Sequence, residues 1–168
     1  MYRWHSHWRR TGRIRISRFS QRTDLCSQST SQTTIRRSIT LIDAATKRLV
    51  RARAGDICEY CHIAQSSELF RHHIEHIIPK QHHGTDHSDN LALACYYCNG
   101  HKGTNLTAYD PENGELQVLY HPRLHEWNTH FHVDAGIVIG LTAVGRATVQ
   151  LFGMNDELRI DARIESSK

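Results

Sequence analysis

The chain of 168 residues lacks an apolar run of the ~18 residues that a membrane helix requires. Its mean hydropathy of −0.55 is also low, so we expect no membrane partner. Three prolines and ten glycines are too few for a collagen-like or linker-like chain. The amino-terminal residues contain no apolar segment typical of a secretory signal. We therefore expect a cytoplasmic protein.

Acidic residues are nearly missing from residues 1–40, which hold nine arginines and one acid, Asp24. This segment carries a net charge of +8, so residues 41–168 carry −4 of the overall +4. It is rich in Ser and Thr and has no lasting apolar period, which predicts a disordered basic arm. Three interpretations stay open: an organelle leader, an arm that binds nucleic acid, and a start of translation assigned too far upstream.

Four of the five cysteines form two closely spaced pairs. Cys58-x2-Cys61 and Cys95-x2-Cys98 are separated by 33 residues. Each pair presents two thiolates from one tight turn, and two such turns complete a tetrahedral zinc site with bonds of about 2.3 Å. Disulfides would require an oxidising compartment, for which the sequence gives no sign. We predict a structural Zn²⁺ ion, with Cys26 as a free thiol.

Local patterns predict short elements around these cysteines. Apolar residues at helical spacing indicate a helix over 41–55, with Thr40 as its N-cap and Gly55 at its end. The remaining expected elements are strands at Leu69–Ile78, Leu91–Ala94, Leu106–Tyr109, Leu116–Tyr120 and Ile137–Leu141, and helices at Tyr96–Gly103, Leu124–His130, Ala143–Phe152 and Asp156–Ile164.

The segment between the cysteine pairs gathers carboxylate, imidazole and carboxamide groups. In order it contains Glu75-His76, Pro79, Gly84, Asn90-Leu91, Asn99 and Lys102. With the cysteines, this pattern resembles the HNH endonuclease motif in its version braced by a four-cysteine zinc site. The motif covers residues 58–103, and the wider likeness covers about 41–165. The resemblance implies an α+β protein: a ββα-metal finger with its preceding helix over 41–105, and a small α/β extension over 106–168.

The resemblance also implies roles for individual residues. His76 is the general base that deprotonates the attacking water, and Glu75 is the acidic ligand of a catalytic metal. Asn90 fastens the loop between the strands and so orients the base, while Asn99 is the second metal ligand. His73 lies two residues before Glu75, so on a strand both share a face, and His73 is a candidate third metal ligand or phosphate contact.

Two residues depart from the family's usual pattern, and Lys102 is a further candidate for the site. Glu75 stands where Asp is commoner, and His83 stands where a second glycine is usual. The first change affects metal preference or rate, and the second affects the reach of the loop. Lys102 is a candidate phosphate contact because it follows Asn99 on the expected helix.

The chemistry of phosphodiester hydrolysis requires these same types of group. An imidazole is a suitable base at cellular pH, and an oxygen-ligated ion with open positions supplies a Lewis acid. Carboxylate and carboxamide oxygens suit Mg²⁺ or Mn²⁺. This chemistry and the resemblance together lead us to expect a metal-dependent endonuclease that acts on DNA, and the resemblance implies a 5′-phosphate product.

Other functions remain open at this point. A zinc-braced module that binds nucleic acid without cutting it has the same fold, and a structural or protein-interaction zinc domain is a third reading. The charge of −4 on residues 41–168 counts against tight non-specific DNA binding. Cleavage of both strands usually needs two active sites, so a homodimer is a further expectation.

Overall fold

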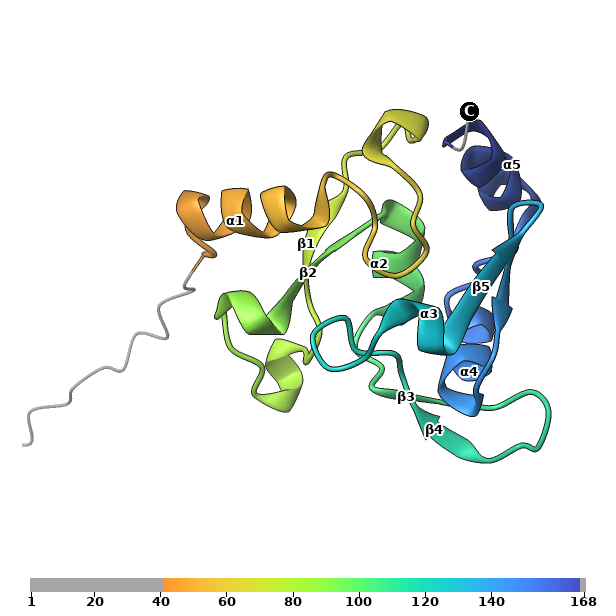
Figure 1. Cartoon of the computed structure of the whole chain (residues 1–168). Helices are drawn as coiled ribbons and strands as arrows, with labels where there is room; N and C mark the ends of the chain where they lie inside the picture. The colour runs from red at the N-terminus through yellow and green to blue at the C-terminus, as the bar shows by residue number, and fades with distance from the viewer. Residues whose placement is uncertain (1–40, 167–168) are drawn as a thin grey trace, which may run out of the picture. The chain divides into compact units, whose positions relative to one another are not determined.

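The computed structural model describes residues 41–166, and the predicted basic arm over 1–40, with Cys26, lies outside them. The described residues form an α+β structure in which antiparallel two-stranded hairpins alternate with helices (Figure 1). Among these residues, no helix has the length and apolar character needed to cross a membrane.

Helix α1 (Ala44–Ala54) precedes the first cysteine pair, where the helical period predicts it. Its N-cap is Asp43, whose carboxylate accepts hydrogen bonds from two backbone amides of the first turn at 2.8 and 2.9 Å. The predicted N-cap at Thr40 is therefore wrong, because Asp43 itself satisfies the free amides. Gly55 ends the helix with a φ of 59°, a left-handed conformation that costs glycine little.

A short hairpin and a helix form the central ββα unit. Strand β1 (His73–His76) pairs antiparallel with β2 (Leu91–Ala94), and helix α2 (Tyr96–Lys102) follows directly. The strand predicted over Leu69–Ile78 is much shorter in the structure, because only the four residues of β2 are available to pair with it. The order strand, strand, helix confirms the finger that the sequence predicts.

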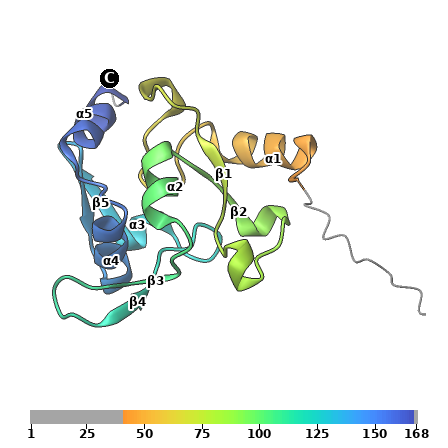
Figure 2. The same ribbon diagram turned by 180° about the vertical axis from the view of Figure 1, so that it is seen from behind.

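The two faces of this hairpin meet different parts of the protein. Side chains alternate along a strand, so Ile74 and His76 point to one face and Glu75 to the other. On the first face, Leu93 packs with Val50 of α1. Helices α1 and α2 lie on either side of the hairpin in both views (Figures 1 and 2). Neighbouring residues of β1 thus face different surroundings.

The carboxyl-terminal part adds two hairpins and three helices. The strands of the carboxyl-terminal part pair in sequence order, and its first turn lies at residues 110–114 as predicted. Earlier in the chain, short 3₁₀ turns lie at Gln65–Ser67, Lys80–His82 and Ser88–Asn90. The elements are β3 (Thr107–Tyr109), β4 (Leu116–Val118), α3 (Trp127–His130), β5 (Phe131–Asp134), β6 (Ile137–Gly140), α4 (Ala143–Leu151) and α5 (Glu157–Ser166).

One apolar cluster joins the ββα unit to this extension. Tyr60, which lies between the first two cysteines, contacts Phe152 at the end of α4, with ring centroids 5.1 Å apart. The indole N–H of Trp127 donates a hydrogen bond to the carbonyl of Tyr60 at 2.9 Å. The extension therefore packs directly on the first cysteine turn. A domain division at residue 105 stays a prediction.

Candidate functional site

The two cysteine pairs meet in the interior of the protein. Cys58, Cys61, Cys95 and Cys98 are all buried, and their sulfur atoms lie within 4.8 Å of one another. The Cys61 and Cys95 sulfurs are 3.7 Å apart, close to the separation of about 3.8 Å that tetrahedral Zn–S bonds of about 2.3 Å produce. Burial raises the pKa of the Cys58 and Cys98 thiols, so an ion that binds them as thiolates must offset this cost. The four-cysteine cluster fits a structural zinc ion.

A buried arginine of the last helix reaches this cluster. Arg159, on α5, is 1% exposed and donates from its guanidinium to the Cys98 sulfur at 2.9 Å. It also donates to the carbonyl of Gly153 at 2.9 Å. Burial alone would lower the pKa of Arg159, but the neighbouring cysteines outweigh it and raise that pKa. The positive charge therefore lies beside sulfurs that carry negative charge when they bind a metal.

Glu75 is enclosed on the α2 face of the hairpin. One carboxylate oxygen pairs with the ammonium group of Lys102, and the other accepts a hydrogen bond from the Tyr60 hydroxyl at 2.7 Å. Burial raises the pKa of Glu75, although Lys102 and Tyr60 oppose the shift. Burial and the nearby Glu75 raise the pKa of Tyr60 as well, so its hydroxyl keeps its proton and donates.

His76 lies at the end of β1 and points toward the loop that joins the two strands. Its Nε2 atom is 2.7 Å from one carboxylate oxygen of Asp86. The other oxygen of Asp86 pairs with the ammonium group of Lys80 at 2.8 Å. The imidazole is partly exposed, so water reaches this side of the hairpin. Glu75 and His76 therefore face different surroundings, although they are adjacent in sequence.

Asn90 ties that loop together through its carboxamide. Its oxygen accepts a hydrogen bond from the amide of Ile78, and its NH₂ group donates to the carbonyls of Ile78 and Thr85, each at 2.9 Å. Gly84 lies against the same carbonyl, since a Cβ atom at this position would be 1.6 Å from the oxygen of Ile78. Asn90 thus holds the backbone of the loop at two carbonyls and one amide, and its implied role in orienting the base stays a prediction.

The other predicted residues lie along α2 and the start of β1. Asn99 is half-buried in α2, one helical turn beyond Tyr96. His73 is exposed, and its ring lies 6.4 Å from the ring of Tyr96. Lys102 is 2% exposed and also donates to the carbonyl of His76 at 3.1 Å. This differs from the predicted phosphate contact, which requires an ammonium group that reaches solvent.

Glu75 and Asn99 suit a divalent ion in their chemistry. A carboxylate and a carboxamide are oxygen donors of the kind that Mg²⁺ and Mn²⁺ prefer. In the described arrangement, however, the cation beside Glu75 is Lys102. A metal ion at this carboxylate would compete with Lys102.

A cleft of about 680 Å³ separates the loop after β1 from the segment around Arg123. Its walls include His82, His83 and His121, while Glu75, His76 and Asn99 are not among the lining residues. Burial and the neighbouring His125 lower the pKa of His121, so this imidazole is neutral at pH 7. Of the predicted site residues, Asn90 lines this cleft, whereas Glu75 and His76 lie outside it.

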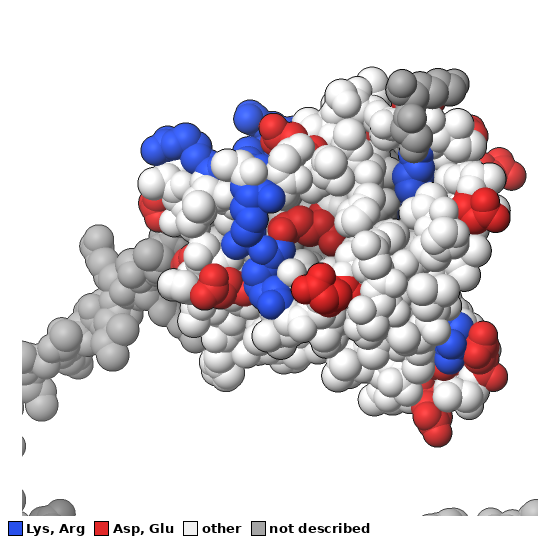
Figure 3. Space-filling view, viewed as in Figure 1, with Lys and Arg blue, Asp and Glu red and all other residues white. Residues whose placement is uncertain are grey.

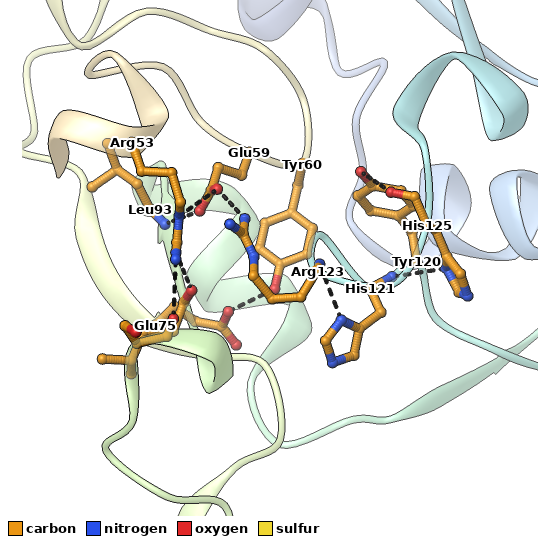
Figure 4. A network of polar contacts seen from close by, with 11 residues as sticks. Arg53, Glu59, Tyr60, Glu75, Leu93, Tyr120, His121, Arg123 and His125 are labelled. Carbon is orange, nitrogen blue, oxygen red and sulfur yellow. Dashed lines mark hydrogen bonds and ion pairs between the residues drawn. The ribbon is translucent and has the colours of Figure 1, made fainter. Parts of the chain in front are cut away.

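The arginine at the edge of this cleft forms an ion pair within the protein. Arg123 pairs with Glu59, and Arg53 also approaches Glu59 at 3.7 Å (Figure 4). The same close-up shows Tyr60 directed toward Glu75 and the backbone amide of Arg123 directed toward the ring of His121 (Figure 4). Arg123 and Arg53 therefore share the single carboxylate of Glu59, which also accepts a hydrogen bond from the backbone amide of Leu93 in β2.

Basic side chains on the face seen in Figure 1 do not form a broad patch. Lys and Arg atoms gather in a short stripe, with Asp and Glu atoms directly beside it (Figure 3). Non-specific binding to DNA depends on neutralisation of several phosphates. This face alone therefore supplies little of the positive charge that such binding requires.

Three contributors were not predicted from the sequence: Asp86, Tyr60 and Arg159. Asp86 lies in a polar loop where acidic residues are common, and only its distance from His76 distinguishes it. Tyr60 and Arg159 reach the site through tertiary packing. Tyr60 lies 15 residues from Glu75 in the sequence, and Arg159 lies 61 residues from Cys98. Arg159 and Arg163 lie four residues apart and share one face of the predicted last helix, but the sequence does not show that this face is buried.

Comparison with known proteins gives one family match. Residues 58–105 match the protein-family model described as HNH endonuclease. This confirms the resemblance over both cysteine pairs and the segment between them. Searches of curated proteins and of solved structures gave no significant match.

Proposed function

We propose that this chain, with its HNH-type segment at residues 58–105, is an endonuclease that hydrolyses phosphodiester bonds of DNA. The observation that carries the proposal is His76 at the end of β1, partly exposed and hydrogen-bonded through one nitrogen to Asp86. An imidazole held in this way keeps its other nitrogen for a proton from water. The family match supports a nuclease over the other chemistry that a histidine and an aspartate perform.

In this proposal His76 takes the proton of the attacking water, and Asn90 keeps the loop around it in place. Glu75, Asn99 and His73 would hold Mg²⁺ or Mn²⁺. When bound, that ion supplies a Lewis acid that neutralises charge on the phosphate and on the leaving 3′ oxygen. Lys102 must release Glu75 before the ion binds, and the Tyr60 hydroxyl then still orients the carboxylate.

A second function is favoured by one specific observation. The Glu75 carboxylate is occupied by Lys102 and Tyr60 and faces away from the His76 side of the hairpin. A chain that kept this arrangement would bind nucleic acid through a zinc-braced finger and would not cleave it. Neither proposal requires a homodimer, which the family match and the described residues do not support.

A plasmid-cleavage assay distinguishes the two proposed functions. We expect the full chain with bound zinc to nick supercoiled DNA when Mg²⁺ or Mn²⁺ is added, and His76→Ala to lose this activity by about a hundredfold or more. His101→Ala is the matched control, since His101 is an exposed histidine of α2. If His76→Ala nicks as fast as the unchanged chain, or if neither cleaves while zinc stays bound, the nuclease is excluded. A gel-shift assay on the same proteins then tests for binding alone.

A further inference from the structure

We propose that Asp86 is a positioning residue for His76, which it holds in one tautomer and one orientation. This inference rests on the proposed function and adds a residue to it. It starts from geometry: Oδ1 of Asp86 is 2.7 Å from Nε2 of His76, and Oδ2 is 2.8 Å from the ammonium group of Lys80. Both carboxylate oxygens are thus engaged, and the carboxylate has a defined direction.

The chemistry of the two groups decides which nitrogen of His76 carries the proton. A carboxylate only accepts hydrogen bonds, so the short contact requires an N–H at Nε2 of His76. In the neutral ring the other nitrogen, Nδ1, then carries a lone pair and can accept a proton from water. Without an acceptor at Asp86, the ring is free to exchange tautomers and to rotate.

The charge of Asp86 is secure over the pH range in which an imidazole titrates. Hydrogen bonds from Lys80 and His76 lower the pKa of this carboxyl below its ordinary value. Asp86 is therefore a carboxylate, and an acceptor of hydrogen bonds, at neutral pH. Lys80 contributes by fixing the second oxygen, so it supports the contact without touching His76.

The backbone of the loop explains how Asp86 reaches His76 from ten residues farther along the chain. Gly84 passes so close to the carbonyl of Ile78 that no Cβ atom fits. Asn90 donates to the carbonyl of Thr85, the residue directly before Asp86. Asn90 therefore orients the base indirectly: it holds the loop, and the loop presents Asp86.

The first test measures the tautomer of His76 in the unchanged, zinc-loaded chain. Two-dimensional ¹⁵N–¹H NMR distinguishes the protonated from the bare ring nitrogen, and His76→Ala assigns the signal. We expect Nε2–H and a bare Nδ1 at a pH where the ring is neutral. A ring that carries its proton on Nδ1 overturns the inference without the need for any other variant.

The second test combines Asp86→Asn with cleavage kinetics. An amide both donates and accepts, so we expect a mixture of His76 tautomers, a kcat lower by about tenfold to a hundredfold, and a KM changed by less than about twofold because Asp86 does not bind substrate. Asp89→Asn is the matched control: it removes the same charge from the same loop, and the exposed Asp89 contacts His87 and Ser88 instead of His76.

The outcomes separate this inference from the proposed function. Suppose that the unchanged chain cleaves DNA. If Asp86→Asn then shows the same His76 tautomer or the same kcat as the unchanged chain, Asp86 does not position the base. If the unchanged chain does not cleave but Asp86→Asn shifts the tautomer, the nuclease is wrong and the positioning contact stands. Zinc content equal to that of the unchanged chain shows that each variant is folded around its metal.

Discussion

The carboxylate of Glu75 and the ammonium group of Lys102 form an ion pair inside the protein, with side chains only 5% and 3% exposed. Glu75 belongs to β1 and Lys102 to the last turn of α2, so the pair joins the hairpin to the helix. A buried ion pair contributes little net stability, but the loss of one member leaves a costly charge without a partner. Under the proposed function, a metal ion at Glu75 would compete with Lys102 for the carboxylate.

Lys102→Met is expected to destabilise the protein. The substitution leaves the buried carboxylate of Glu75 without its counter-charge, which costs about 3–5 kcal/mol in comparable cases. Urea unfolding of the zinc-loaded chain measures the loss. The double variant Glu75→Gln/Lys102→Met removes both charges and keeps an acceptor for Tyr60, so it should recover most of the stability. Equal stability of the two variants would show that the ion pair is not formed.

The same lysine should compete with a divalent ion for Glu75. We expect Mg²⁺ or Mn²⁺ to raise the melting temperature of Lys102→Met more than that of the unchanged chain, because a ligand that binds the folded state stabilises it. Lys47→Met, a change at an exposed lysine of α1, is the control. Identical shifts in all three proteins would argue against Glu75 as a metal ligand.

Arg159 should increase the affinity of the protein for zinc. Its guanidinium donates to the Cys98 sulfur, and loss of such a partner to a metal ligand typically lowers affinity by about tenfold to a hundredfold. Arg159→Met is therefore expected to release zinc to a chromogenic chelator at correspondingly lower chelator concentrations. Arg48→Met, at an exposed arginine of α1, provides the comparison. Unchanged zinc affinity in Arg159→Met would limit Arg159 to a packing role.

The elements that the sequence predicts well are those with local signals. The pair Cys95-x2-Cys98 marks the start of α2, and Leu91–Ala94 is a short apolar run that becomes β2 as predicted. The length of β1 could not be predicted in the same way, because it depends on the four residues that its partner offers. Strand β5 (Phe131–Asp134) was missed, since its pairing with β6 is not visible in its own residues.

The candidate site is predictable in its residue types and not in its contacts. A pattern of motif residues identifies Glu75, His76 and Asn90, but not the direction in which each side chain points. Alternation along β1 sends Glu75 toward α2 and His76 toward Asp86. The occupation of Glu75 by Lys102 depends on how α2 packs against the hairpin, which no local pattern encodes.

Gly84→Ala should disturb the loop that carries Asp86. The new methyl group would lie 1.6 Å from the carbonyl oxygen of Ile78 and 2.8 Å from the side-chain nitrogen Nδ2 of Asn90. The loop must therefore move. We expect a loss of about 1–3 kcal/mol in stability and a weaker His76–Asp86 contact, seen as a change in the His76 tautomer.

A second glycine supplies the control for this change. Gly100 lies within α2, and an added Cβ there meets nothing within 4 Å. Gly100→Ala should therefore stabilise the protein by about 0.5–1 kcal/mol, because alanine loses less conformational freedom in a helix than glycine does. If both variants lose stability equally, the close approach of Gly84 to Ile78 is not the cause.

The buried carboxyl of Glu75 should make stability depend on pH in a defined direction. Burial raises its pKa above the ordinary value of 4.5, and Lys102 opposes that shift. A group whose pKa is raised in the folded state contributes its full stability below its unfolded pKa and loses it as the pH rises through the folded pKa. Lys102→Met removes the opposing charge, so this variant should lose stability as the pH rises above the ordinary carboxyl pKa of 4.5.

The slope of this loss is at most about 1.4 kcal/mol per pH unit for one proton. Glu75→Gln/Lys102→Met has no carboxyl at this position and should lack the slope. Urea unfolding of both variants across the same pH range measures the slope. Both variants share the zinc thiolates, so the difference between the two slopes cancels the contribution of the thiolates. Parallel curves would mean that Glu75 is ionised at no extra cost, and its carboxylate would then be open to solvent and not enclosed between Tyr60 and α2.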